Sequence, residues 1–268
     1  MRRFFINARD IVGGTAKIIG DEAYHIIKVL RLGPGTSIII CDGEGYEYKG
    51  DIASIDSNTV IIKILGAKKT GGEPGVKISL AQALSRKSAN FEFVIQKAVE
   101  LGVNNIVPLL TDRTVVRAEE DRFRKRRKRW QRIALEAAKQ SRRGRVPAVE
   151  KPSNLQDFLE RLPRDTLCLM PWEGEDSTGI GEILKWESSK NFIRPVALLI
   201  GPEGGFTPEE VDNARRSGAI PVSLGPRILR TETAGIIALG IVLYELGDLG
   251  GAKFVKAQTK SGCTSAGL

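Results

Sequence analysis

The stretch Ile200-Gly-Pro-Glu-Gly-Gly-Phe-Thr-Pro-Glu-Glu-Val211 carries the clearest structural signal in the sequence. The apolar run that ends at Ile200 predicts a buried strand, and the Gly and Pro residues after it exclude regular structure in the loop. Thr207 then fits a helix N-cap, with Pro208 at the first helical position and Glu210 completing a capping box. The stretch therefore predicts a strand, a glycine loop and a helix in succession.

A second unit of the same kind follows at once, in Leu224-Gly-Pro-Arg-Ile-Leu-Arg-Thr-Glu-Thr-Ala234 and an apolar helix that continues to about Leu246. Gly218 is expected to end the preceding helix, and residues 221–224 to form the strand between the two units. Ligands of open α/β sheets bind at the carboxyl ends of strands, and glycine lets a backbone approach them closely. Free N–H and C=O groups there would suit an adenine edge and ribose hydroxyls, whereas the simpler alternative is a pair of tight turns.

Two familiar phosphate motifs are missing from these loops. The pattern G-x-x-x-x-G-K-[ST] does not occur, so the sequence argues against a P-loop. The spacing of Gly201, Gly204 and Gly205 differs from G-x-G-x-x-G, so a classical dinucleotide site is not supported either.

The Gly- and Lys-rich residues 66–75 are the expected linker between two regions. Short β-branched runs with glycine turns precede it, as in a small β-barrel. One helix interrupts these strands, with Asp21 as its expected cap and an apolar stripe of Ala23, Ile26, Ile27 and Leu30.

Apolar strands and amphipathic helices alternate after the linker, which predicts a parallel sheet covered by helices. The expected strands are residues 76–84, 106–110, 166–170 and 196–200. Asn90 is expected to cap the first helix of this region, Gly102 to end it, and a long helix to cover residues 119–141.

The long helix concentrates the positive charge of the chain. Residues 121–132 hold eight Lys or Arg and one acid, a local charge of +7 that leaves +2 of the total +9 for the other residues. Phe123, Trp130, Ile133, Ala134 and Ala137 form a core stripe, so the helix should be packed. Such a concentration of charge favours contact with the phosphates of a polyanionic partner, either nucleic acid or an acidic membrane surface, and an ordinary solvated face is the alternative.

Bulk composition narrows the class of protein further. The 268 residues are 41% hydrophobic, enough for one large or two modest domains. The three cysteines lie far apart without a C-x-x-C pair, so we expect neither disulfides nor a metal site, and a cytoplasmic location. The start of the chain does not read as a signal peptide, and the apolar run 234–246 is too short to span a bilayer. No membrane partner is therefore expected.

Several motifs together resemble the RsmE family of SPOUT-class RNA methyltransferases. Besides the two glycine loops, they are Arg3-Phe4-Phe5, His25-Ile-Ile-Lys-Val-Leu-Arg-Leu-Gly-Pro-Gly35, Ile95-Gln-Lys-Ala-Val-Glu-Leu-Gly102 and Glu136-Ala-Ala-Lys-Gln-Ser-Arg142. The resemblance covers nearly the whole chain to about residue 247. It implies an α/β protein with an N-terminal PUA-like β-barrel (residues 1–70) and a C-terminal trefoil-knotted SPOUT methyltransferase domain (74–249). The patternless tail, 250–268, is expected to be disordered.

The resemblance also implies the reaction, S-adenosyl-L-methionine-dependent methylation of N3 of a uridine in 16S (small-subunit) rRNA by a homodimer. Carried over by motif, the cofactor site comprises Leu199, Ile200, Gly201, Gly204, Gly205, Leu224, Gly225, Ile228, Leu229, Arg230, Thr233 and Ala234, with residues 169–171 as a third wall. The candidate RNA contacts are Arg3, Arg31, Arg122, Arg126, Arg127, Arg129 and Arg142.

Uridine N3 must lose a proton before it attacks a methyl group, so some residue should accept that proton or stabilise the anion. Arg230 is the candidate for stabilisation, with a phosphate contact or a salt bridge as alternatives. Glu203 is the candidate for substrate placement, with ordering of its own loop as the alternative. His25, the single histidine, is expected to be solvated or to face RNA, and Cys168 to be buried and inert.

Three rival functions remain at this point. A non-catalytic RNA-binding ribosome-assembly factor would need the basic helix but not both glycine loops. A doubly wound metabolic enzyme would need neither the basic helix nor this loop pattern. A SPOUT methyltransferase acting on another RNA position remains open, because the loops recognise the cofactor and not the target.

Overall fold

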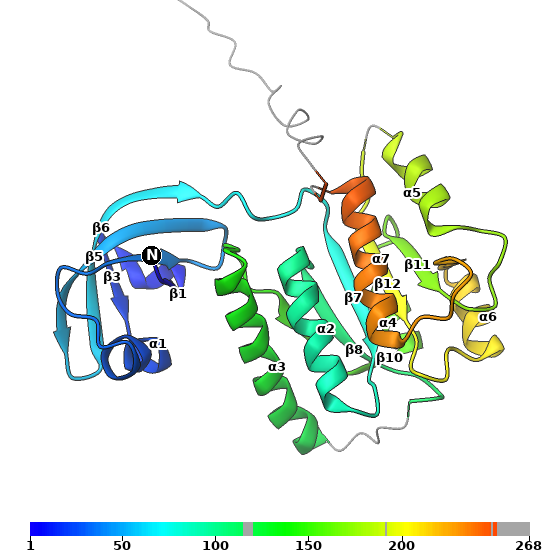
Figure 1. The fold of residues 1–268 in the computed structure, drawn as a ribbon, viewed down its shortest axis with the longest axis horizontal. Coiled ribbons are helices and arrows are strands. Elements are labelled where there is room, and N and C mark those ends of the chain that lie inside the picture. The colour runs from blue at the N-terminus through cyan, green and yellow to red at the C-terminus, as the bar shows by residue number, and fades with distance from the viewer. Residues whose placement is uncertain (115–119, 191, 248, 251–268) are drawn as a thin grey trace, which may run out of the picture. The chain divides into compact units, whose positions relative to one another are not determined.

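The computed structural model describes residues 1–114, 120–190, 192–247 and 249–250 of the chain (Figure 1). The predicted tail lies outside the described residues from 251 onwards. The chain divides into two compact units, and the division runs through helix α2 (Ser88–Leu101). The first unit comprises Met1–Glu73, Ile95–Asn104 and Glu120–Val149, and the second Pro74–Val94, Asn105–Glu119 and Glu150–Leu268.

The first unit contains a six-stranded sheet in the order β1-β4-β5-β6-β3-β2. Neighbouring strands are antiparallel except β1 and β4, which are parallel. Apolar side chains such as Phe4, Ile38 and Ile62 bury one face of the sheet. The strands are β1 (Arg3–Phe5), β2 (Ile11–Val12), β3 (Thr15–Ile18), β4 (Ser37–Cys41), β5 (Tyr46–Asp56) and β6 (Thr59–Lys69).

Strand β6 corrects the predicted linker. Residues 66–69, expected to be loop, continue β6 and pair with residues 46–49 of β5. The long β5 supplies hydrogen-bond partners as far as Lys69, and these tertiary contacts override the weak strand preference of glycine and lysine. The connection between the two regions is therefore shorter than the sequence suggested.

The first helix also differs in detail. Helix α1 (Gly20–Tyr24) begins before Asp21, and its N-cap, Ile19, makes no side-chain cap hydrogen bond. Asp21 lies in the first turn, where a carboxylate favours the helix through the macrodipole. The chain continues as a π-helical turn, His25–Val29, and a 3-10 turn, Ala8–Asp10, precedes it in the sequence.

The basic helix α3 (Glu120–Gln140) and the short strand β9 (Ala148–Val149) belong to the first unit. Phe123, Trp130, Ala134 and Ala137 are buried as the stripe predicted, whereas Ile133 is half-buried. Arg143, just after α3, is 2% exposed and donates to the carbonyls of Val99 and Val103 and to the Glu73 carboxylate. This arginine therefore has a structural role within the first unit.

The second unit is built on the predicted parallel sheet, in the order β10-β8-β7-β12-β11-β13. Its strands are β7 (Ile78–Ala83), β8 (Asn105–Leu110), β10 (Ser153–Asn154), β11 (Leu167–Pro171), β12 (Val196–Ile200) and β13 (Ile220–Val222). The first helical residue of α2 is Ser88, so Asn90 lies inside the helix and is not its cap as expected, because the turn at Ser85–Lys87 already redirects the chain.

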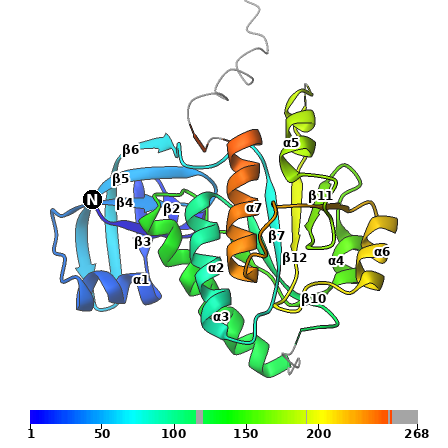
Figure 2. The same ribbon diagram turned by 45° about the vertical axis from the view of Figure 1, so that its right-hand side comes forward.

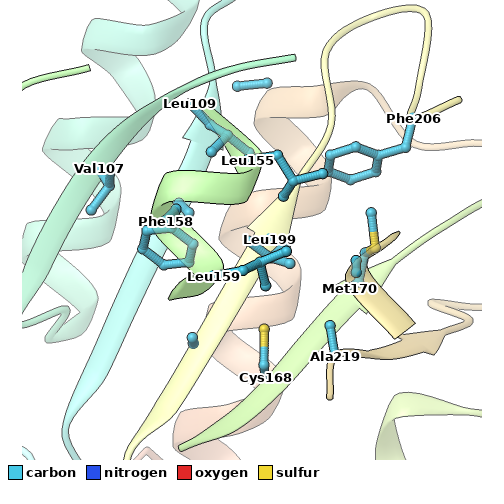
Figure 3. Close-up of a cluster of buried hydrophobic side chains, with 14 of the residues drawn as sticks. Val107, Leu109, Leu155, Phe158, Leu159, Cys168, Met170, Leu199, Phe206 and Ala219 are labelled. Atoms are coloured by element: carbon cyan, nitrogen blue, oxygen red, sulfur yellow. The ribbon is translucent and has the colours of Figure 1, made fainter. Parts of the chain in front are cut away.

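Helices cover both faces of this sheet. Helices α4 (Leu155–Arg161) and α6 (Pro208–Arg216) pack on one face, where Leu199, Met170, Phe158 and Phe206 meet in the core (Figure 3). On the other face α7 (Thr231–Leu246) crosses β7 and β12 and packs against α5 (Ile180–Ser188) (Figure 2). The short elements α4, α5 and β10 had no clear sequence signal.

A buried carboxylate in α5 predicts a pH dependence of stability. Glu187 is 0% exposed, and its two oxygens accept three bonds of 2.8 Å from Arg194 and Lys190. Hydrogen bonds from Arg194, opposed by burial, lower the pKa of Glu187 to about 2. Because this pKa is lower in the folded state, ionised Glu187 stabilises the fold at pH values above its unfolded-state pKa of about 4.5. This contribution is lost as the pH falls from about 4.5 to about 2.

We therefore expect Glu187→Gln to lower the free energy of unfolding by about 2 kcal/mol at pH 7, discounted for the partly exposed cations. The difference from the wild type should shrink as the pH falls below about 4. Urea unfolding at several pH values measures both effects. Glu182→Gln, at an exposed position of the same helix, is the control. A deficit independent of pH would contradict the assignment.

Candidate functional site

The two glycine loops meet at the carboxyl edge of the parallel sheet and line one cavity of about 1250 Å³. The first loop, residues 201–206, follows β12, and the second, residues 223–230, follows β13. Residues that follow β7, β8 and β11 complete the wall. All of these residues belong to the second unit, and their location is the one expected for a ligand site in an open α/β sheet.

The first loop has the geometry that its sequence predicted. Thr207 and Glu210 form a reciprocal capping box, with Thr207 N donating to Glu210 Oε2 at 2.8 Å and Glu210 N to Thr207 Oγ1 at 3.1 Å. Gly205 has φ +67°, which favours glycine, and a Cβ there would lie 2.9 Å from a Glu173 oxygen. The other Glu210 oxygen accepts from Asp112 N at 2.9 Å, which ties α6 to the end of β8.

Two further contacts hold the first loop from the side of β7 and β8. Arg113 Nη1 donates to the carbonyl of Gly204 at 2.5 Å and to that of Phe206 at 3.5 Å. A Cβ on Gly204 would lie 3.3 Å from Arg113 Cδ, so glycine leaves room for this arginine. Arg86 N donates to Glu203 Oε1 at 3.0 Å, and Glu203 thus joins the first glycine loop to the segment that follows β7.

A chain of hydrogen bonds joins the two glycine loops. Gln82 Nε2, in β7, donates to Thr231 Oγ1 at 2.8 Å, and that hydroxyl donates to the carbonyl of Gly201 at 2.5 Å. Since a carbonyl can only accept, the proton order runs from amide to hydroxyl to carbonyl. Gly235 makes room for this strap, because a Cβ there would lie 2.3 Å from Gln82 Oε1. In the described part of the chain, that Oε1 atom has no hydrogen-bond partner.

The loop after β11 forms the opposite wall, with Pro171, Trp172 and three acidic residues. Arg215 lies 5.8 Å from the centre of the Trp172 ring, and a Cβ on Gly174 would clash with that ring. The predicted third wall, residues 169–171, thus reaches the cavity only at Pro171, because Leu169 and Met170 are fully buried.

Most of the predicted cofactor residues are brought together at the cavity: Ile200, Gly201, Gly204, Gly205, Leu224, Gly225, Ile228, Leu229, Arg230 and Ala234. Leu199 and Thr233 are not among the lining residues. Leu199 alternates with Ile200 along β12 and therefore points into the core on the other face. Thr233 is exposed on α7.

Both catalytic candidates line the cavity as well. Arg230 is the exposed N-cap of α7, and its carbonyl accepts from Ala234 N at 2.8 Å. Among the described residues its guanidinium has no ion-pair partner, which leaves it available to a ligand. Glu203 is exposed, with one oxygen used by Arg86 N.

The candidate RNA contacts all lie in the first unit. Arg31, Arg129 and Arg142 are exposed, and Arg126 is half-buried. Arg3 instead pairs with Glu47 at 2.5 Å, and Arg127 Nε donates to the carbonyl of Val149 at 2.8 Å. These two arginines thus have structural partners that the sequence did not reveal. The side chain of Arg122 is outside the described part of the chain.

Two other expectations concern His25 and Cys168. His25 is half-buried, and its ring meets the Phe4 ring edge-on at a centroid distance of 6.3 Å. Cys168 is buried, and burial raises the pKa of its thiol to about 12, which keeps it protonated and unreactive. Within the described residues, no cluster of His, Cys, Asp and Glu could hold a metal ion, and no helix could span a membrane.

Sequence reasoning missed several residues of the site. Arg86, Lys87, Asn90, Arg113 and Trp172 line the cavity, and Gln82 supports it from below. They come from three strand ends distant in the sequence from the glycine loops. The one available signal was position, since each except Asn90 lies at or just after the end of a predicted strand.

Comparison with known proteins gives this site a class. Residues 72–243 match the family model described as an RNA methyltransferase domain, and residues 18–65 match the one described as an RNA methyltransferase PUA domain. The chain thus belongs to the class of PUA-containing RNA methyltransferases.

Full-length relatives specify the family. The chain is 34% identical to ribosomal RNA small subunit methyltransferase E of Bacillus subtilis, over 86% of this chain and 90% of that protein. It is 33% identical to the protein of the same name from Synechocystis, and the match covers 88% of this chain and 75% of that protein. The crystal structure of the Neisseria gonorrhoeae protein of that name, bound to S-adenosyl methionine, superposes with a TM-score of 0.78 at 30% identity. The match covers 93% of this chain and 99% of that chain. The chain therefore belongs to the ribosomal RNA small subunit methyltransferase E family.

Proposed function

We propose that the protein transfers a methyl group from S-adenosylmethionine to N3 of a specific uridine in small-subunit (16S) rRNA. The observation that carries this proposal is the meeting of two glycine loops around one cavity at the carboxyl edge of a parallel sheet. The family supports the cofactor and the type of RNA, and the relatives' shared name supports the small subunit.

The residues of the cavity fit this cofactor. Ile200, Leu224 and Leu229 provide apolar surface for a base. Gly205 and Gly225 have φ values of +67° and +111°, which favour glycine. Without side chains at these positions, the main chain can approach a ligand closely. Glu173, in the loop after β11, lines the same cavity and can balance a positive charge.

The bound cofactor supplies an electrophilic methyl group on a sulfonium. The chain supplies position and electrostatics. The Arg230 guanidinium would favour the deprotonated uridine, because a cation near the base stabilises the negative charge that develops when N3 loses its proton. Glu203 would hold the loops that place the base.

The position of the methyl group is directly testable. N3 lies on the pairing edge of uridine, so its methylation blocks reverse transcription at that nucleotide. Small-subunit rRNA incubated with the protein and cofactor should give a new stop at one uridine. A methylated nucleoside without such a stop would place the methyl group elsewhere and contradict the N3 proposal.

We propose that α3 contacts RNA through its exposed and half-buried cations, since residues 121–132 carry a charge of +7. Arg126 and Lys128 make no described ion pair. The double variant Arg126→Glu and Lys128→Glu should weaken RNA binding about tenfold and flatten its salt dependence by roughly 0.7–0.9 per lost phosphate contact. Arg127 is avoided because it bonds Val149. Filter binding measures the effect, and an equal loss of cofactor affinity would indicate misfolding.

A homodimer is also proposed. Helix α7 is apolar along most of its length, yet Ile237 and Tyr244 are 43% and 62% exposed and lie seven residues apart on one face. An exposed apolar stripe of this kind favours association with a second copy. Sedimentation velocity would contradict the proposal by showing a mass of 29.3 kDa at micromolar concentration.

The remaining proposals concern topology and location. We propose that residues 1–70 form a PUA-like β-barrel and that residues 74–249 form a trefoil-knotted SPOUT domain. A crystal structure whose chain closes without threading would contradict the knot. A cytoplasmic location follows from the proposed substrate, and cell fractionation tests it.

A further inference from the structure

Two groups of charged residues flank the first glycine loop at the cavity, apart from Arg227, Arg230 and Glu232 in and after the second loop. Arg86 and Lys87, which follow β7, and Arg113, which follows β8, lie on one side. Three acids from the loop after β11 lie on the other side: Glu173, Glu175 and Asp176. The strand order β8-β7-β12-β11 separates the two groups, because the first glycine loop follows the strand between them. One cavity thus has a cationic wall and an acidic wall.

The cationic wall is held in place by main-chain contacts. Two loop carbonyls accept from Nη1 of Arg113 and fix its guanidinium against the first glycine loop. Glu203 fixes the backbone of Arg86, and Ser85 Oγ donates to the carbonyl of Lys87 at 2.9 Å. The exposed side chains of Arg86 and Lys87 have no ion-pair partner among the described residues. Three cations thus line this side of the cavity, and none of them has an ion-pair partner among the described residues.

We propose that Arg86, Lys87 and Arg113 form a phosphate-binding subsite for the RNA strand that carries the target nucleotide. The proposal rests on the proposed function, because it takes RNA as the substrate, and it adds the side of the cavity from which the strand enters. The fork of Arg113 and the neighbouring charges suit phosphate oxygens, whereas the acidic wall repels them. The RNA strand is therefore expected to lie along the side of the cavity that is lined by the residues following β7 and β8.

The cofactor offers a competing anion, because its amino-acid end carries a carboxylate. The two sources predict different results when the cationic wall is changed. Loss of phosphate contacts weakens RNA binding and its salt dependence, whereas loss of a carboxylate contact weakens cofactor binding in the absence of RNA.

The test uses the double variant Arg86→Glu and Lys87→Glu of the full chain. Arg113 is left intact because it supports the first glycine loop. The control carries the same charge change at Lys151 and Arg164, which are exposed in the same unit but do not line the cavity. The RNA probe is transcribed small-subunit rRNA, naked and in reconstituted subunits. Calorimetric titration with S-adenosylmethionine alone gives the cofactor affinity.

We expect the double variant to bind RNA at least tenfold more weakly, with a salt slope shallower by about 0.7–0.9 per lost contact, and to bind cofactor within twofold of the wild type. RNA affinity equal to that of the wild type and the control would overturn the subsite. A loss confined to cofactor affinity would also overturn it and assign the wall to the carboxylate. Weakened binding by the variant, with no methyl transfer by the wild type, would support the subsite and count against the proposed function.

Discussion

Thr231→Val should lower the affinity for S-adenosylmethionine at least tenfold and the free energy of unfolding by about 2 kcal/mol. Thr231 is 7% exposed, and its hydroxyl accepts from Gln82 and donates to the carbonyl of Gly201. Valine has nearly the same shape but can do neither, so the Gly201 carbonyl would lose its partner and the buried Gln82 amide would keep only the 3.5 Å contact with the carbonyl of residue 231. The first glycine loop would then lose its hydrogen-bonded connection to the start of α7, which follows the second loop.

Thr231→Ser keeps the hydroxyl and should restore both quantities to near the wild-type value. Gln82→Glu should resemble the valine variant, because a carboxylate cannot donate to the hydroxyl. Thr233→Val, at an exposed position of the same helix outside the cavity lining, is the matched control. Calorimetric titration and urea unfolding measure the two effects. Valine and serine variants with equal cofactor affinity would show that the strap does not shape the site.

Arg230→Ala should slow methyl transfer about 100-fold while cofactor affinity stays within threefold of the wild type. The reason is that the guanidinium lies at the cavity with no carboxylate partner among the described residues, so its charge is available to the deprotonated base. Single-turnover transfer to small-subunit rRNA measures the rate. Arg230→Lys should recover part of it, because the charge remains but its position changes.

Arg227→Ala serves as the comparison, since Arg227 is an exposed cation in the same loop. A general loss of positive potential would affect both variants equally. An Arg230→Ala protein that transfers at the wild-type rate would exclude a catalytic role for this side chain. If its cofactor affinity falls as much as its rate, Arg230 contributes to cofactor binding instead.

Local patterns predicted the parts of the fold that depend on local physics. The capping box of Thr207 and Glu210, the helix end at Gly102 and the buried stripe of α3 are encoded within a few residues and occur as expected. The strand β6 runs past its predicted end because its partner lies elsewhere in the sequence. The cap predicted at Asp21 was wrong because the helix begins at Gly20, so that its N-cap is Ile19, two residues earlier.

The site shows the same limit. The composition of the glycine loops is enough to predict them, but the residues that support them come from distant segments. Gln82 and Thr231 are 149 positions apart, and Arg113 and Gly204 are 91 apart. Periodicity carries no information on such contacts. Charge alone also did not reveal the structural partners of Arg3 and Arg127, Glu47 and the carbonyl of Val149, which are brought near them only by folding.

The central claim is that the cavity between the two glycine loops binds S-adenosylmethionine, and calorimetric titration of the purified wild-type protein tests it most directly. The account predicts one site per chain with a dissociation constant in the micromolar range, lost or strongly weakened in Thr231→Val and retained in Thr231→Ser. No detectable binding by the wild type, with or without small-subunit rRNA, would contradict it.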